Sequence, residues 1–157
     1  MFKKILVPYD GSQMAAKIFP QVAALAKTCN SRVTLIYVFH TDKVWGGTPG
    51  MLAEVPEKAL KSCENFLSEA GGELQKNGVE ADWVCIEGVP AREIIQYADA
   101  NKMDVIAMAT HGRGEIAWVL GSVAEQVVTH SNTPVLLFRV IETRPPRRKE
   151  EVVVPPW

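Results

Sequence analysis

The residues best suited to chemistry lie between positions 109 and 125, where three glycines share the segment with His111, Arg113 and Ser122. Glycine lets the backbone turn sharply and approach a ligand, and the free N–H groups at the start of a helix attract phosphate oxygens. The segment is therefore typical of a phosphate-binding loop. The alternative is a glycine-rich connection to a capped helix, because Ser122 and Glu125 have the spacing of a capping box.

Patterns for other chemistry are missing from the sequence. His40, His111 and His130 do not have metal-ligand spacing, and neither a GxxxxGK[ST] loop nor a GxSxG elbow occurs. Phosphoryl transfer needs a metal, an oriented nucleophile and charge stabilisation in addition to binding. We therefore expect a ligand cradle without catalytic residues, and not an enzyme.

Composition limits the class of protein. A chain of 157 residues that is 47% hydrophobic is long enough for one self-sufficient core. A net charge of −1 provides no basic field for nucleic acid, so no nucleic-acid partner is expected. No apolar stretch has the length of a signal peptide or membrane span, which predicts a cytoplasmic protein without a membrane partner. Cys29, Cys63 and Cys85 are odd in number and widely spaced, and we expect them to be reduced thiols.

Strands and helices alternate along the first 140 residues. Apolar and β-branched runs predict strands at 5–7, 32–39, 79–86, 104–108 and 134–140. Helical periodicity predicts helices at about 12–30, capped by Ser12, and at about 56–76, 88–101 and 122–130. This alternation indicates an α/β fold, a single doubly wound parallel sheet with helices on both faces. Ligands bind such sheets beyond the carboxyl ends of the strands, so the loops after the first and fourth strands should form the site.

Three segments resemble the universal stress protein family: KKILVPYDGS at 3–12, THGRG at 110–114 and GSVAEQVVTHSNTPVLLFR at 121–139. The resemblance implies a five-stranded sheet of order 3-2-1-4-5, the adenine nucleotide alpha hydrolase-like fold. It also implies a universal stress protein domain over 1–141, which leaves 142–157 as a Pro- and Arg-rich tail. That tail is either disordered or an arm laid across a partner subunit.

By the same resemblance the ligand is an adenine nucleotide, either ATP, accompanied by Mg²⁺, or AMP or ADP. The residues carried over to the nucleotide site are Pro8, Tyr9, Asp10, Val38, Met108, Ala109, His111, Gly112, Arg113, Gly121, Ser122 and Val123. Asp10 would accept from a ligand hydroxyl or amino group, or be only a turn residue. Val38 would contact the adenine, or be ordinary core. Arg113 would pair with phosphates, or be a solvated loop charge. His111 would donate to a phosphate, or only shape the turn.

The chain departs from the motif of ATP-binding members, which is Gly-x-x-Gly, nine residues, then Gly-Ser or Gly-Thr. Ala109 replaces the first glycine, and eight residues, 113–120, separate Gly112 from Gly121. A methyl group at Ala109 could crowd the ribose or phosphates. The alternative function is therefore a dimeric interaction module of the same fold that does not bind nucleotide. A third hypothesis is slow ATP hydrolysis in the same pocket.

The fifth strand supplies the expected protein partner. It should lie at an edge of the sheet, where an exposed apolar strand invites pairing with another chain. In the family the corresponding strand joins two subunits, which implies a homodimer through Val135 and Leu137.

Overall fold

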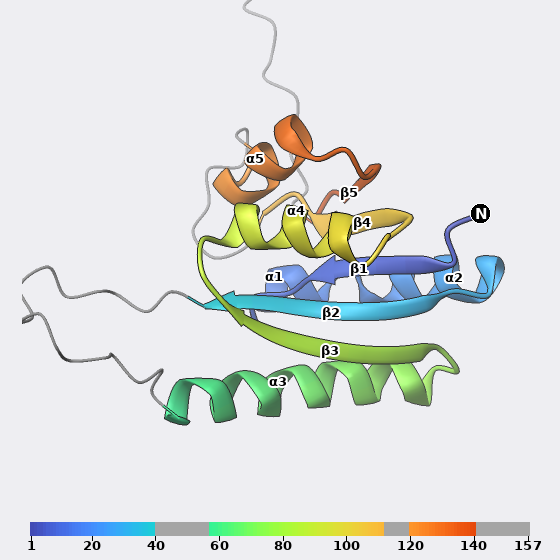
Figure 1. Cartoon of the computed structure of the whole chain (residues 1–157). Helices are drawn as coiled ribbons and strands as arrows, with labels where there is room; N and C mark the ends of the chain where they lie inside the picture. Colours follow the sequence, from blue (N-terminus) through green and yellow to red (C-terminus); the bar gives the residue numbers. More distant parts are fainter. Residues whose placement is uncertain (40–56, 112–119, 141–157) are drawn as a thin grey trace, which may run out of the picture.

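The structure, a computed structural model, describes residues 1–39, 57–111 and 120–140 (Figure 1). The elements in chain order are β1 (Lys4–Pro8), α1 (Gln13–Ala16), α2 (Phe19–Cys29), β2 (Arg32–Phe39), α3 (Glu57–Lys76), β3 (Glu80–Glu87), α4 (Pro90–Ala100), β4 (Val105–Ala109), α5 (Ser122–His130) and β5 (Val135–Phe138). The predicted tail lies outside the described residues.

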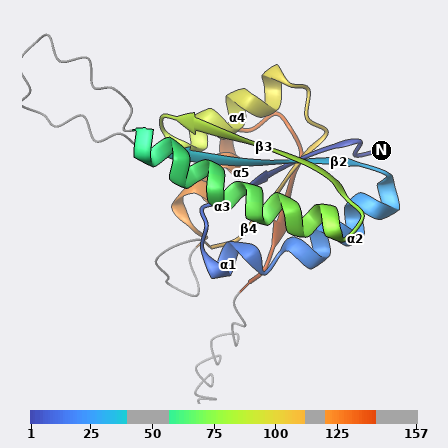
Figure 2. The same cartoon turned by 90° about the horizontal axis from the view of Figure 1, so that it is seen from below.

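All five strands are parallel, as the alternation of elements predicted, and their order in the sheet is β3-β2-β1-β4-β5, as the resemblance to the universal stress protein family implied. Figure 1 shows α4 in front of the sheet with α1 and α2 behind it, and Figure 2 shows α3 running along β3. β2 and β3 lie on one side of β1 in the sheet, and β4 and β5 lie on the other side. The strand order therefore reverses between β1 and β4, which makes this pair the switch point of a doubly wound fold.

Each face of the sheet has its own core because successive side chains of a strand point to opposite faces. Ile5 and Val7 of β1 join a cluster with residues of α2 and α3, whereas Leu6 joins a cluster with residues of α4 and α5. All three side chains are fully buried. The continuous apolar run of β1 is therefore explained by burial on both faces, as is typical of parallel sheets.

One predicted helix is two helices in the structure. The sequence predicted a single helix from Ser12 to about Asn30, but α1 ends at Ala16 and α2 begins at Phe19. Pro20 explains the break, because in a continuous helix its ring would clash with the carbonyl of Ala16 and it has no N–H to donate. In the first turn of α2 the same proline is tolerated. Asn30 ends α2 in the left-handed conformation, near the predicted position.

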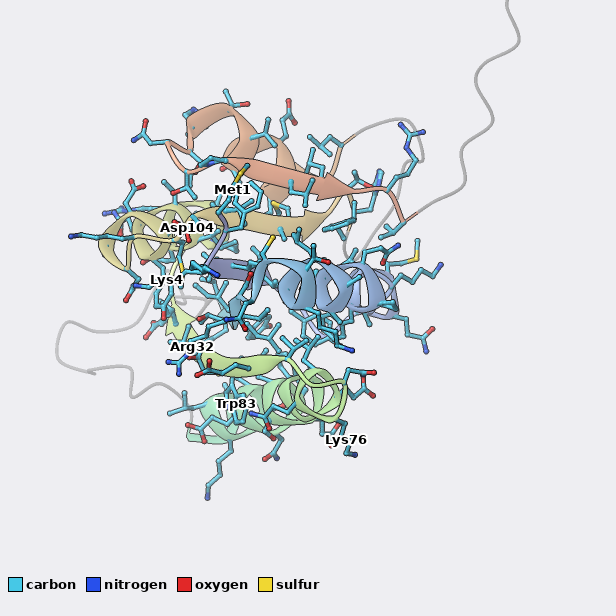
Figure 3. The ribbon with its side chains drawn as sticks, turned by 90° about the vertical axis from the view of Figure 1, so that its right-hand side faces the viewer. Met1, Lys4, Arg32, Lys76, Trp83 and Asp104 are labelled. Carbon is cyan, nitrogen blue, oxygen red and sulfur yellow. A yellow bond between two sulfur atoms is a disulfide. The ribbon has the colours of Figure 1, made fainter. Side chains whose placement is uncertain are left out.

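The amino ends of the strands, which face the viewer in Figure 3, are tied together by polar contacts. The backbone N–H of Lys4 donates to Asp104 Oδ2 at 2.9 Å, and the N–H of Asp104 donates to the Lys4 carbonyl at 3.0 Å. Arg32 pairs with Glu80, whose hydrogen bond and charge raise the pKa of the guanidinium. These contacts join β1 to β4 and β2 to β3 at the end of the sheet remote from the predicted site.

The prediction of three reduced cysteines is wrong for two of them. Cys63 of α3 and Cys85 of β3 form a disulfide with a Cα–Cα distance of 6.3 Å, and Cys29 is a free thiol. From Cys63 to Lys76 the helix rises roughly 20 Å at about 1.5 Å per residue. From Val79 to Cys85 the chain returns roughly the same distance at about 3.3 Å per residue. A spacing of 22 residues therefore brings the two sulfur atoms together across the turn.

The paired glycines of α3 provide a test of how closely this helix packs on β3. A Cβ at Gly71 would lie 2.6 Å from Cε3 of Trp83, whereas a Cβ at Gly72 would meet nothing within 4 Å. We expect Gly72→Ala to stabilise the protein by up to about 1 kcal/mol through helix propensity. Gly71→Ala should destabilise it by about 1–3 kcal/mol through overpacking. Denaturant unfolding of both variants checks this, and equal stabilisation by both would show that Trp83 does not pack against Gly71.

Candidate functional site

A cavity of 260 Å³ opens at the carboxyl ends of β1, β2 and β4. The start of α5 forms one of its walls and the start of α4 another. Its place is the switch point between β1 and β4, where doubly wound sheets bind ligands.

Ten of the twelve predicted site residues line this cavity. They are Pro8, Tyr9, Asp10, Val38, Met108, Ala109, His111, Gly121, Ser122 and Val123. Gly112 and Arg113 lie outside the described residues. The fold therefore gathers residues from three separate regions of the sequence around one space, and their contact with a nucleotide stays a prediction.

Asp10 shapes the entry to α1 as well as lining the cavity. Its Oδ1 accepts a hydrogen bond from the N–H of Ser12 at 2.9 Å across Gly11, whose φ is +76°. The Ser12 side chain in turn accepts from the N–H of Ala15 at 3.1 Å and caps α1. The turn role that the sequence allowed for Asp10 is thus present, and it fixes the carboxylate at the rim of the cavity.

The amino end of α5 is the part of the site most suited to an anion. Gly121 is the N-cap, and intrahelical bonding begins with Glu125 N–H donating to the Gly121 carbonyl at 2.9 Å. In an α-helix the N–H groups before that point have no intrahelical acceptor and attract negative charge. Ser122, Val123 and Ala124, which carry these groups, all line the cavity.

The alternative reading of a capping box at α5 does not match the structure. Ser122 is the first residue of the helix, and the N-cap is Gly121, which has no side chain to cap with. Gly121 occupies the cap position because its N–H donates to the Thr110 carbonyl at 2.9 Å, and a Cβ there would lie 3.1 Å from the same oxygen. The close passage of residue 121 against Thr110 therefore favours glycine, since a side chain here would make the Thr110 carbonyl give way by a few tenths of an ångström.

His111 is the buried polar side chain of the site. It is 8% exposed, and its Nδ1 lies 3.0 Å from Thr110 Oγ1. The Thr110 N–H donates to the Phe138 carbonyl at 2.9 Å, which continues the pairing of β4 with β5 past the end of β4. His111 is thus held at the cavity by a backbone that is itself fixed to the sheet.

Aromatic rings form the wall of the cavity on the side of α2 and α3. Tyr9 contacts Phe19 with ring centroids 5.0 Å apart, and it contacts Phe66 at 5.9 Å. Tyr37 meets Phe66 at 5.0 Å in an edge-on arrangement. Tyr9 and Tyr37 line the cavity, and Phe66 of α3 lies behind both of them.

Seven lining residues were not predicted, namely Ala15, Ile36, Tyr37, Pro90, Ile94, Thr110 and Ala124. Pro90 could have been found, because a helix that follows a parallel strand begins at the carboxyl end of the sheet, where the site was expected. Tyr37 and Ile36 carry no comparable signal, since β2 is apolar throughout and its sequence does not show which positions border a space.

Away from the cavity, one further titratable group is perturbed. Burial raises the pKa of the Tyr97 hydroxyl on α4, and the negative charge of Asp82 raises it further.

Within the described residues, no group of three or more His, Cys, Asp or Glu side chains could hold a metal ion. None of the helices in that part of the chain is long and apolar enough to cross a membrane.

The fold and the cavity define a doubly wound α/β protein with a cavity at its switch point. Residues 1–139 match the model of the Universal stress protein family. A universal stress protein of Thermus aquaticus is 33% identical over 141 residues, which cover 88% of this chain and all of that protein. One of Methanocaldococcus jannaschii is 30% identical over 88% of this chain and 83% of its own length. The chain belongs to the universal stress protein family.

Solved structures agree with this assignment. A second Methanocaldococcus jannaschii protein superposes with a TM-score of 0.78 at 28% identity, over 91% of this chain and 99% of that one. A universal stress protein in complex with cAMP gives a TM-score of 0.67 at 20% identity. One from Archaeoglobus fulgidus in complex with dAMP gives 0.67 at 22% identity. The last two likenesses show the shared fold.

The different positions of two serines provide a test at the two helix starts. Ser12 is the N-cap of α1 and caps it through its side chain, whereas the exposed Ser122 is the first residue of α5 and not its N-cap. We expect Ser12→Ala to lower the free energy of unfolding by about 1 kcal/mol. Ser122→Ala should change it by less than about 0.5 kcal/mol. Urea denaturation of both variants measures the difference, and a larger loss for Ser122→Ala would restore the capping box.

Proposed function

We propose that this chain binds an adenine nucleotide in the switch-point cavity and acts as a nucleotide-responsive stress protein of the cytoplasm. The observation that carries the proposal is the cavity itself, which combines an apolar part with an anion-attracting part. A nucleotide has the same division, because its base is flat and largely apolar at its faces and its phosphates are charged.

The apolar part suits a purine base. Ile36 and Val38 of β2, Met108 of β4 and Ile94 of α4 all line the cavity. They belong to the core cluster between the sheet and helices α4 and α5, so their positions are fixed before a ligand arrives. A preformed apolar wall reduces the entropy lost on binding.

The polar part suits phosphates and a ribose. The start of α5 supplies backbone N–H groups and the positive end of the helix dipole. Asp10, on the β1 side, presents a carboxylate that can accept from a ribose hydroxyl, since its position is set by Ser12. The nucleotide could bring Mg²⁺ with it, because that ion is usually held by one or two carboxylates together with substrate phosphates.

Ala109 does not by itself argue against this function. It is 8% exposed and belongs to the core cluster on the side of α2 and α3. Much of the space for its methyl group is therefore provided by the core. The cAMP and dAMP complexes of two structural neighbours add support for a ligand of the adenine nucleotide class.

Calorimetric titration of nucleotide-stripped protein with ATP, ADP and AMP, each with and without magnesium, tests the proposal. We expect micromolar binding of at least one nucleotide. Gly121→Val should weaken it at least about tenfold, because its Cβ would lie 3.1 Å from the Thr110 carbonyl and a branched side chain there should shift the start of α5.

Gly72→Ala is the matched control, since a Cβ at that position meets nothing within 4 Å and Gly72 does not line the cavity. It should bind like the parent. Thermal unfolding of both variants shows whether a lost signal is a lost site or a lost fold. No heat of binding with any of the three nucleotides would overturn the proposal.

The second candidate function is a dimeric interaction module, and the edge strand β5 favours it. Leu136 is 37% exposed on this edge, whereas Val135 and Leu137 are half-buried against their own core. The predicted contact through Val135 and Leu137 would therefore use their backbone and remaining exposed surface, with Leu136 added from the other face.

Sedimentation velocity at micromolar concentration tests this assembly. We expect a dimer for the parent chain, and we expect Leu136→Lys to shift it toward monomer, because a lysine on an edge strand opposes pairing with another chain. Val128→Lys is a control at an exposed apolar residue outside β5, and it should sediment like the parent. A monomeric parent chain would exclude the dimeric module.

A further inference from the structure

The Cys63–Cys85 disulfide lies next to the aromatic wall of the cavity. Cys85 of β3 is the register partner of Tyr37 on β2, and Tyr37 lines the cavity. Cys63 lies three residues before Phe66 on α3, so the two side chains share a face of the helix. Phe66 contacts both Tyr37 and Tyr9. The two halves of the disulfide thus belong to the elements that hold the wall.

The disulfide also fixes the first part of α3. From residue 59 to residue 62 the side chains of this helix are partly or fully exposed, and Cys63 is the first buried one. Leu67, Ala70 and Leu74 anchor the remaining turns in the core. Phe66 lies where these two parts meet. Its position behind the cavity therefore depends on the cross-link more than the positions of the later core residues do.

One sulfur atom of the bridge belongs to a residue near the surface. Cys85 is partly buried and lines a second hollow of 500 Å³ together with Trp83 and residues of α3. Cys63 is fully buried. A thiol from solution would therefore reach the bridge through Cys85.

We propose that Cys63–Cys85 is a reversible redox switch of the cavity and that its oxidised form binds nucleotide more tightly. This inference rests on the proposed nucleotide function. In the cross-linked state Phe66 supports Tyr9 and Tyr37 in fixed positions, which preorganises the wall. Reduction frees the first turns of α3 and removes that support. In a cytoplasmic protein a disulfide is usually a redox-sensing or catalytic one.

The reduction is an ordinary thiol–disulfide exchange. A thiolate forms a bond to Sγ of Cys85, the bond between the two cysteines breaks, and its electron pair leaves on Cys63, which takes up a proton. With dithiothreitol the second thiol of the reagent, as its thiolate, then displaces Cys85. The reagent is oxidised to its cyclic disulfide, and Cys85, like Cys63, ends as a thiol after protonation.

Because of thermodynamic linkage, the coupling between the disulfide and the nucleotide can be measured either from nucleotide binding or from reduction of the disulfide. If oxidation tightens nucleotide binding by a given factor, nucleotide must oppose reduction of the bridge by the same factor. We expect at least about fivefold, the lower end of typical coupling between two sites.

The experiment compares full-length protein as oxidised and as reduced with dithiothreitol, each titrated calorimetrically with Mg-ATP and with AMP. Mass spectrometry after alkylation reports the state of the cysteines in each sample. A Cys63→Ala/Cys85→Ala double variant should bind with the affinity of the reduced parent under both conditions. Cys29→Ala, which removes the free thiol, should keep the full redox dependence.

Tighter binding by the oxidised form, lost in the double variant, supports the switch. Equal binding by both forms overturns it and leaves the proposed function intact. Alkylation of Cys63 and Cys85 in protein treated with an oxidant, without prior reduction, also overturns it, because no bridge would then exist. Absence of binding in both forms removes the proposed function and the switch together. The parent comparison holds even if the double variant does not fold.

Discussion

β1 and β4 pair over two register positions, Ile5 with Val105 and Leu6 with Ile106, whereas β1 pairs with β2 over five. The position of the site depends on this short pairing of β1 with β4. On one side of it the chain leaves β1 toward α1, and on the other it leaves β4 toward α5, so the two connections diverge and a space remains between them. At the opposite end of the sheet the bonds between Lys4 and Asp104 fix the two strands to each other. The location of the cavity is thus a consequence of topology.

The site is also continuous with the core. Ile36 and Met108 line the cavity and belong to the cluster beneath α4 and α5. Ala109, which also lines it, belongs to the cluster on the opposite face, and Tyr9 packs against that cluster. A ligand in this space would therefore contact residues from both halves of the folded protein. Binding to the folded state alone stabilises a protein by mass action, so occupancy and fold stability are coupled through the same side chains.

Sequence patterns were sufficient for the elements and the parallel sheet because the dominant signals are local, as in the apolar run of β1 and the periodicity of α3. The strand order and ten of the lining residues came from the resemblance to the family. The errors arise where contacts in the folded structure decide how a segment folds. The apolar periodicity continues across Pro20, so the sequence predicted one helix where the structure has α1 and α2. Ser122 has the spacing of a capping residue, but the contact of Gly121 with Thr110 moves the cap by one position. The bridge between Cys63 and Cys85 depends on the match between helix rise and strand rise, which no spacing rule contains.

The two edges of the sheet differ in chemistry. β3 presents the exposed charged side chains Glu80 and Asp82, both of which pair with Arg32 of β2. β5 has no charged residue and presents Leu136. A second copy that approached β3 edge to edge would have to accommodate these charged side chains, whereas one that approached β5 would meet apolar side chains. A dimer formed through β5 would cover that edge in both molecules and leave the two charged β3 edges outside, so it would close on itself rather than continue into a filament.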